Sequence, residues 1–262
     1  VDLVSILKRL FSLHRFGIKP GLERTLLLLE TLDNPHTKFT SIHVAGTNGK
    51  GSTCSMLAAI LTSAGYRTGL YTSPHIREFN ERIRVNGQPI SDEDIARFAI
   101  PLLDESENAP TTFFEITTAM AFAYFAEQKV DIAIIETGMG GRLDSTNVLS
   151  PIASIITSID LDHVQYLGFT LESVTREKAA IIKTNTPAFI AEQRTSLRDI
   201  FLKQAEEVRS NLSFVHDIYT SEIVSWNKDF SMNIHINTPS GKIENLECAV
   251  AGIHQISNIY AV

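Results

Sequence analysis

Apolar residues recur along the chain with two different spacings, and the two kinds of segment alternate. Helical spacing and helix-stop signals predict helices over residues 1–13, 22–32, 54–64, 91–107, 116–128, 175–183 and 196–210. Short runs rich in apolar and β-branched residues predict strands over residues 41–45, 68–73, 131–137, 152–159 and 186–191. The run over 131–137 is continuously apolar, as in a parallel strand buried on both faces. We therefore predict an α/β fold with a largely parallel sheet flanked by helices.

The pattern changes after residue 211. Polar and apolar residues alternate over 230–236 and within 241–250, with a Pro239-Ser-Gly241 turn between the two stretches. Alternation with a period of two residues, interrupted by turn residues, predicts antiparallel strands. Residues 211–250 are therefore predicted to form a small antiparallel β appendage, after which Gly252 opens a further helix.

A glycine-rich segment, Gly46-Thr-Asn-Gly-Lys-Gly-Ser52, joins the first predicted strand to the next helix. Glycines allow a sharp turn with N–H groups pointing inward, and a helix N-terminus and a lysine add positive charge, so the segment predicts a P-loop. It is a variant, because Gly51 stands where Ser or Thr usually follows Gly-Lys. A plain glycine-rich turn is the alternative, which a lysine within the turn disfavours. The residues predicted to bind nucleotide phosphates are Thr47, Asn48, Gly49, Lys50, Gly51 and Ser52.

Polar residues stand at the carboxyl ends of three predicted strands, namely Ser73, Glu136 and the run Asp160-Leu-Asp-His163. Ligands of open parallel sheets bind beyond these ends, so Glu136 can take the metal position of a Walker-B acid. Ser73 also begins a long segment, residues 73–87, which Pro, Asn and Gly residues punctuate. We predict it to be a long ordered loop, and such loops are often functional.

Composition narrows the class of protein further. The chain has 262 residues, of which 44% are hydrophobic and 20% charged, as in an ordinary globular domain. A formal net charge of −7 gives no electrostatic support for binding nucleic acid. Cys54 and Cys248 form no disulfide framework or metal spacing, which favours reduced thiols in a cytoplasmic protein. We expect no signal peptide or membrane span, because charged residues interrupt the N-terminal segment and apolar runs are short.

Two strings make the chain resemble a known family. The glycine-rich segment ending Lys-Gly-Ser52, and the string from Glu136 to Asn147 (Glu-Thr-Gly-Met-Gly-Gly-Arg-Leu-Asp-Ser-Thr-Asn), resemble folylpolyglutamate synthase and dihydrofolate synthase of the Mur ligase superfamily. Residues 73–87 resemble the loop that covers the substrate in that family. Further matches run along nearly the whole chain, whereas peptidoglycan-type Mur ligases usually lack the glycine after the lysine.

The resemblance implies roles for particular residues. Ser73 and Glu136 would hold one Mg²⁺, and His163 would bind a second, although imidazole is not a preferred ligand of Mg²⁺. Lys178 would be carbamylated, and Asn258 would contact adenine. A strand-capping role for Ser73 and a helix-dipole role for Glu115 are the structural alternatives, as are plain surface charges for the two basic residues of the N-terminal segment. The substrate-binding residues implied are His14, Arg15, Thr112, Phe113, Phe114, Glu115, Arg142, Leu143, Asp144 and Ser145.

The function implied is an ATP-dependent carbon–nitrogen ligase. It would add L-glutamate to dihydropteroate, to the γ-carboxylate of folates, or to both, using ATP and Mg²⁺ and forming an acyl phosphate. Residues 1–262 would be the central ATPase domain of a monomer, without the family's C-terminal Rossmann-like domain, so we expect the chain alone to bind ATP weakly and form no product. The alternatives are a folylpolyglutamate synthase only, a peptidoglycan-type Mur ligase, and a nucleotide-binding module without ligase activity.

Overall fold

Helices and strands alternate along most of the chain in the computed structural model, which describes residues 2–13, 21–106 and 111–262. The chain divides into two compact units, one comprising residues 1–43 and 57–152 and the other residues 44–56 and 153–262. Most strands belong to a largely parallel sheet with helices beside it, and three more make a small antiparallel sheet. The predicted fold class is therefore confirmed.

In the first unit, the hydrogen-bonded strand order is β4-β3-β2-β5-β1. Strands β2 and β5 pair in parallel, whereas β3 and β4 continue the sheet in antiparallel pairing. Strand β1 and helix α3 each begin in one unit and end in the other. The elements of this unit are α1 (Leu3–Ser12), α2 (Glu23–Thr31), η2 (Pro35–Thr37), β1 (Thr40–Ala45), α3 (Lys50–Ser63), β2 (Thr68–Tyr71), η3 (Phe79–Arg82), β3 (Ile83–Val85), β4 (Gln88–Pro89), α4 (Asp92–Glu105), α5 (Phe113–Glu127), β5 (Ile132–Glu136) and η4 (Ser145–Val148).

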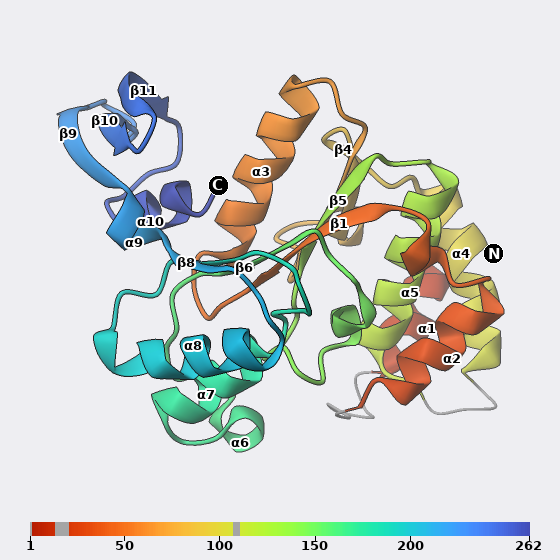
Figure 1. Ribbon diagram of the computed structural model, residues 1–262. Coiled ribbons are helices and arrows are strands. Elements are labelled where there is room, and N and C mark those ends of the chain that lie inside the picture. Colours follow the sequence, from red (N-terminus) through yellow and green to blue (C-terminus); the bar gives the residue numbers. More distant parts are fainter. Residues whose placement is uncertain (1, 14–20, 107–110) are drawn as a thin grey trace. The chain divides into compact units, whose positions relative to one another are not determined.

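The core of the first unit lies around α5, whose side chains are buried on nearly every side. Helices α1, α2 and α4 gather around it in Figure 1. All three contact α5, and α1 also contacts α4. The predicted N-cap of α4 is present, because the Ser91 hydroxyl accepts a hydrogen bond from the Asp94 N–H at 3.0 Å.

In the second unit, strands β1, β6, β7 and β8 are neighbours in that order, and β6–β7 and β7–β8 pair in parallel. Strands β9, β10 and β11 form the antiparallel sheet with β10 in the centre, seen in blue in Figure 1. The elements are β6 (Ala153–Ile156), α6 (Val164–Leu167), α7 (Leu171–Ala179), β7 (Ala188–Ile190), η5 (Thr195–Leu197), α8 (Arg198–Glu207), β8 (Leu212–Phe214), α9 (Val215–Ile218), β9 (Thr220–Trp226), β10 (Met232–Thr238), β11 (Gly241–Cys248) and α10 (Gln255–Tyr260).

Three sequence-based expectations need correction. Residues 73–87 are not one long loop, because they contain η3 and β3, which pairs with β2. Helix α3 begins at Lys50 rather than at residue 54, so the end of the glycine-rich segment is its first turn. The antiparallel appendage begins at β9 rather than at residue 211, because residues 212–214 form β8 of the parallel sheet. Strand β9 was not predicted individually, because both of its faces carry polar or exposed residues and leave little hydrophobic periodicity.

Candidate active site

The glycine-rich segment turns sharply between β1 and α3. Gly46 and Gly49 adopt φ angles of +151° and +88°, a region that side-chain-bearing residues rarely enter. A Cβ on Gly46 would lie 1.8 Å from the Thr157 hydroxyl, so only glycine fits there. Gly51 and Ser52 follow in the first turn of α3, where backbone N–H groups have no acceptor within the helix. The segment thus has the form of a phosphate-binding loop.

The chain after β6 fixes one side of this loop. The Thr47 N–H donates to the Ser158 carbonyl at 2.7 Å, and the Thr47 hydroxyl accepts from the Asp160 N–H at 2.9 Å. The Ser158 hydroxyl in turn donates to the Asn48 carbonyl at 3.2 Å. Thr47 is therefore held through its N–H and its hydroxyl, and Asn48 through its carbonyl, which fixes this part of the loop.

Two lysines contact the backbone of the loop. Lys50 is the first residue of α3, and its Nζ lies 3.2 Å from the Thr47 carbonyl. Lys178 is only 3% exposed, and its Nζ donates to the Gly46 carbonyl at 2.7 Å. The sequence-predicted Lys178 is thus brought to the predicted phosphate site, as an amine that supports the loop.

Helix α10 packs against the opposite side of the loop. The buried side chain of Asn258 lies beside Gly49, and its Nδ2 donates to Gln255 Oε1 at 2.8 Å. Gln255 Nε2 lies 3.5 Å from the Ser52 hydroxyl. The structure therefore brings Asn258 to the loop, as a ligand-binding role requires. It also brings Gln255, which lies one turn before Asn258 and was not predicted to have a role.

Replacing Gly49 by alanine should lower the affinity for ATP about tenfold. A Cβ at this position would lie 2.2 Å from Oδ1 of Asn258, so the buried Asn258 side chain or the loop must move, and the positive φ adds strain of roughly 1–3 kcal/mol. Gly65→Ala is the matched control, because Gly65 has a similar φ of +93° and no atom within 4 Å of the added Cβ. Both variants should lose stability in urea, but only Gly49→Ala should bind ATP more weakly by calorimetry. Equal ATP affinity in the two variants would show that the contact with Asn258 is unimportant.

Glu136 and Ser73 meet at the carboxyl ends of β5 and β2 in the first unit. Glu136 is 4% exposed, and one carboxylate oxygen accepts from the Ser73 N–H at 3.1 Å. A carboxylate and a hydroxyl are oxygen donors suited to Mg²⁺, which usually takes only one or two carboxylates from the protein together with phosphate and water oxygens. These two residues fit a magnesium site of that kind.

The loop after Glu136 is organised by Asp144. Its carboxylate accepts from the N–H groups of Gly138 and Met139 at 2.9 and 2.8 Å and from the backbone and hydroxyl of Thr146. Burial raises the pKa of Asp144, although these hydrogen bonds favour its charged form. Because its oxygens are occupied, Asp144 shapes the loop. Of its neighbours, Ser145 is buried, Leu143 half-buried and Arg142 exposed.

The predicted substrate residues Thr112 to Glu115 begin α5. The Thr112 hydroxyl accepts from the Glu115 N–H, and the Glu115 carboxylate accepts from the Thr112 N–H, which is a capping box. Glu115 also pairs with Arg24 at 2.9 Å. Its carboxylate is therefore engaged in holding α2 to α5. Phe113 is buried and stacks on Phe11 with ring centroids 5.4 Å apart.

The ring of Phe114 packs against the backbone of Gly138, in the loop after Glu136, and leaves no room for a side chain there. A Cβ on Gly138 would lie 2.5 Å from the Phe114 ring, so the backbone and this ring approach as closely as a glycine permits. The structure thus brings Phe114 to the segment that carries Glu136 and Asp144, as their shared substrate role in the sequence analysis requires.

Of the remaining residues predicted to bind metal or substrate, one lies at the start of α6 and two are not among the residues that the structure describes. His163 is the N-cap of α6 with φ +45°, and its half-exposed ring lies 3.6 Å from the Asp162 carboxylate. Among the residues described, no three His, Cys, Asp or Glu side chains gather into a metal-binding group. His14 and Arg15 lie outside the described residues.

The sequence did not predict Arg82 as a functional residue, because nothing in its local sequence distinguishes it from Arg77 and Arg84.

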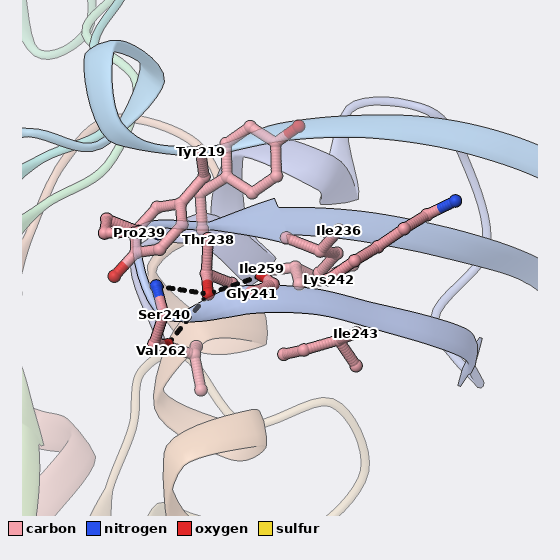
Figure 2. Close-up of a pocket in the computed structure, with 11 residues that line it drawn as sticks. Tyr219, Ile236, Thr238, Pro239, Ser240, Gly241, Lys242, Ile243, Ile259 and Val262 are labelled. Atoms are coloured by element: carbon pink, nitrogen blue, oxygen red, sulfur yellow. Dashed lines mark hydrogen bonds between the residues drawn. The ribbon is translucent and has the colours of Figure 1, made fainter.

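A separate cavity of about 600 Å³ lies in the second unit and contains none of the predicted residues. Figure 2 shows Tyr219, Ile236 and Ile259 around it, with the β10–β11 turn at its edge. The Thr238 hydroxyl closes this turn by donating to the Gly241 carbonyl at 2.8 Å and accepting from the Ser240 N–H at 3.2 Å. The lining consists mainly of apolar and turn residues, with Lys242 as its one charged side chain and no carboxylate among the described lining residues that could bind Mg²⁺.

The loop between β1 and α3 defines an α/β domain of the P-loop type. Comparison with known proteins agrees, since the Mur ligase middle domain family matches residues 44–262. The chain belongs to the Mur ligase family. Among the described residues, no helix combines the length and the apolarity needed to cross a bilayer.

Individual relatives narrow the similarity. The chain is 42% identical over 254 residues to the dihydrofolate synthase/folylpolyglutamate synthase of Bacillus subtilis (strain 168), covering 93% of this chain and 58% of that protein. The folylpolyglutamate synthase structure from Thermotoga maritima matches with a TM-score of 0.88 and 38% identity, over 98% of this chain and 60% of that one. The structure of E. coli FolC in complex with DHPP and ADP matches with a TM-score of 0.87 and 32% identity, covering 100% of this chain and 61% of that one. The chain therefore spans roughly three-fifths of each relative's length.

Proposed function

We propose that the protein is an ATP-dependent ligase that joins L-glutamate to dihydropteroate, to the γ-carboxylate of folates, or to both. One observation carries the proposal: the glycine-rich segment ending Lys-Gly-Ser52 turns into the N-terminus of α3 in a chain 42% identical to a dihydrofolate synthase/folylpolyglutamate synthase. The relatives are longer than this chain, so the activity is proposed for the whole protein.

The chemistry requires an activated acyl group. A carboxylate is a poor acyl donor because its leaving group would be oxide. A carboxylate oxygen of the substrate attacks the γ-phosphorus of ATP, and ADP leaves. The amine of L-glutamate then attacks the acyl carbon and loses a proton, and inorganic phosphate leaves with the former carboxylate oxygen. Positioning and charge neutralisation are the protein's main contributions to such a phosphoryl transfer.

The residues take the following roles in this proposal. Residues 47–52 bind the phosphates, and Lys50 neutralises their charge. Ser73 and Glu136 would hold one Mg²⁺, which neutralises phosphate charge when bound. His163 and a carbamylated Lys178 would serve a second, since a carbamate supplies anionic oxygen and keeps one N–H for the Gly46 carbonyl. Asn258 would offer its amide to adenine.

The incoming acyl substrate would lie against the start of α5. Phe113 and Phe114 supply apolar rings for a pteroate, and the loop over residues 142–145 forms part of the same wall. A folylpolyglutamate synthase without dihydrofolate synthase activity is the second candidate, because the Thermotoga maritima relative carries only that name. The relative rates on dihydropteroate and tetrahydrofolate decide between these two.

Incorporation of radiolabelled glutamate tests the proposal. The full-length protein with ATP and Mg²⁺ should form labelled product from dihydropteroate or tetrahydrofolate, with one ADP released per amide bond. The 262-residue chain alone should bind ATP weakly and form none, because holding amine and acyl phosphate together is worth roughly 7–11 kcal/mol and the chain spans only about three-fifths of its relatives' length. Nucleotide binding without binding of any pteroate would instead indicate a nucleotide-binding module. Equal rates for the short chain and the full-length protein would mean that the glutamate site has been misplaced.

A further inference from the structure

Arg82 is a buried cation that forms no ion pair with any of the residues described. It is the last residue of η3 and is only 7% exposed. Among the residues described, no carboxylate forms an ion pair with it, and its only side-chain hydrogen bond runs from Nε to Nδ1 of His75 at 2.8 Å. A buried charge is costly unless something pairs with it. The four N–H groups at the two terminal nitrogens are therefore available to a ligand.

His75 holds the guanidinium in one orientation. Its Nδ1 accepts the hydrogen bond from Arg82 Nε, so this nitrogen carries no proton and the contact fixes the guanidinium beside the ring. Burial lowers the pKa of Arg82, but an arginine remains charged in this environment. With Nε engaged by His75, the two terminal nitrogens remain as donors that can form a fork.

The acidic groups closest to Arg82 are committed elsewhere. Glu81 accepts from the N–H groups of residues 76–78 at 2.9 to 3.2 Å, and Glu136 accepts from Ser73. Tyr71 faces Arg82, but burial raises the pKa of its phenol to about 12, so it is neutral. Glu136 attracts Arg82 electrostatically but forms no ion pair or hydrogen bond with it among the interactions described, so the terminal N–H groups of Arg82 are left for an anion from outside the protein.

Arg82 lies between the two parts that the proposed substrate must contact. Its guanidinium carbon is 5.1 Å from the centre of the Phe113 ring, at the proposed pteroate wall. Its carbonyl accepts from the Thr72 N–H at 3.0 Å, directly before Ser73, which contacts Glu136. An aromatic substrate that presents its carboxylate to the metal residues passes this point.

We propose that Arg82 binds the carboxylate of the acyl substrate through a bidentate pair, with His75 as the residue that positions it. A guanidinium fork matches a carboxylate in shape and charge. The inference rests on the proposed function and adds to it the group that selects an acidic acyl substrate. It also predicts that a neutral analogue of the same size, such as the carboxamide, binds more weakly because it lacks the charge that pairs with Arg82.

Calorimetry with dihydropteroate and with its carboxamide, both with AMPPCP and Mg²⁺ present, tests this on the full-length protein. Arg82→Gln should lower the affinity for dihydropteroate at least about tenfold and leave that for the carboxamide within about twofold. Arg82→Lys, which keeps the charge but not the fork, should lose an intermediate amount, and it carries the test if the Gln variant does not fold. His75→Ala should also weaken dihydropteroate selectively.

Arg84→Gln is the matched control, because Arg84 lies two residues along on β3 and is more exposed; it should change neither affinity. An equal loss for carboxylate and carboxamide would mean that Arg82 only supports the fold. A loss of AMPPCP affinity measured without dihydropteroate would mean that the anion is phosphate. Either result overturns the proposal. A wild-type protein that binds neither dihydropteroate nor folate would overturn the proposed function as well, which separates the two failures.

Discussion

Lys50→Ala is expected to lower the affinity for ATP by about 100-fold or more while leaving the fold intact. Lys50 is the first residue of α3, and its Nζ lies at the carbonyl of Thr47 within the loop. Removing one partner of a buried, hydrogen-bonded charge pair costs roughly 2–5 kcal/mol, and about 2.7 kcal/mol corresponds to a 100-fold change. Calorimetric titration with ATP measures the effect, and circular dichroism checks the fold.

Lys203→Ala serves as the control for the loss of one positive charge. Lys203 lies on α8 in the same unit as the P-loop and is exposed. Its replacement should leave the affinity unchanged, because exposed charges contribute little to a specific contact. Undiminished ATP binding by Lys50→Ala would mean that the glycine-rich segment is not the phosphate site, and the proposed function would lose its main support.

Glu136→Gln is expected to raise the Mg²⁺ concentration needed for half-maximal activity by about tenfold or more. The amide keeps the shape of the side chain and can still accept from the Ser73 N–H, but it removes the negative charge that attracts the metal. Loss of even an outer-shell partner lowers metal affinity by roughly 10–100-fold. The Mg²⁺ dependence of AMPPCP binding should shift in the same direction, which gives a readout that does not require turnover.

Glu192→Gln is a closely matched control. Glu192 is also 4% exposed and follows a parallel strand, β7, but its carboxylate accepts from the Ile159 N–H and from Arg194. This variant should lose stability without a change in its Mg²⁺ requirement. An unmoved Mg²⁺ titration for Glu136→Gln would remove Glu136 from the metal site.

The sequence alone was sufficient for the fold class and for the glycine-rich turn between β1 and α3. Both depend on local signals: strands and helices follow the period of apolar residues, and the P-loop follows from glycines and a lysine at a strand–helix junction. The strand that ends at Glu136 was identified in the same way, and the structure places this carboxylate beside Ser73. Local periodicity failed over residues 73–87 and at β9, where pairing with a neighbouring strand, rather than apolar spacing, stabilises the strand.

The partners of the charged side chains were decided only by the tertiary structure. Asp144 is predicted as a ligand-orienting group, yet its oxygens bind the backbone of its own loop. Glu115 is paired with Arg24, which lies 91 positions earlier in the chain. Arg82 has a different environment, because it is buried and forms no ion pair with any carboxylate in the described part of the chain. Residue type and spacing report what a side chain is able to bind, whereas folding brings distant residues together and determines which charges are neutralised and which remain available to a ligand.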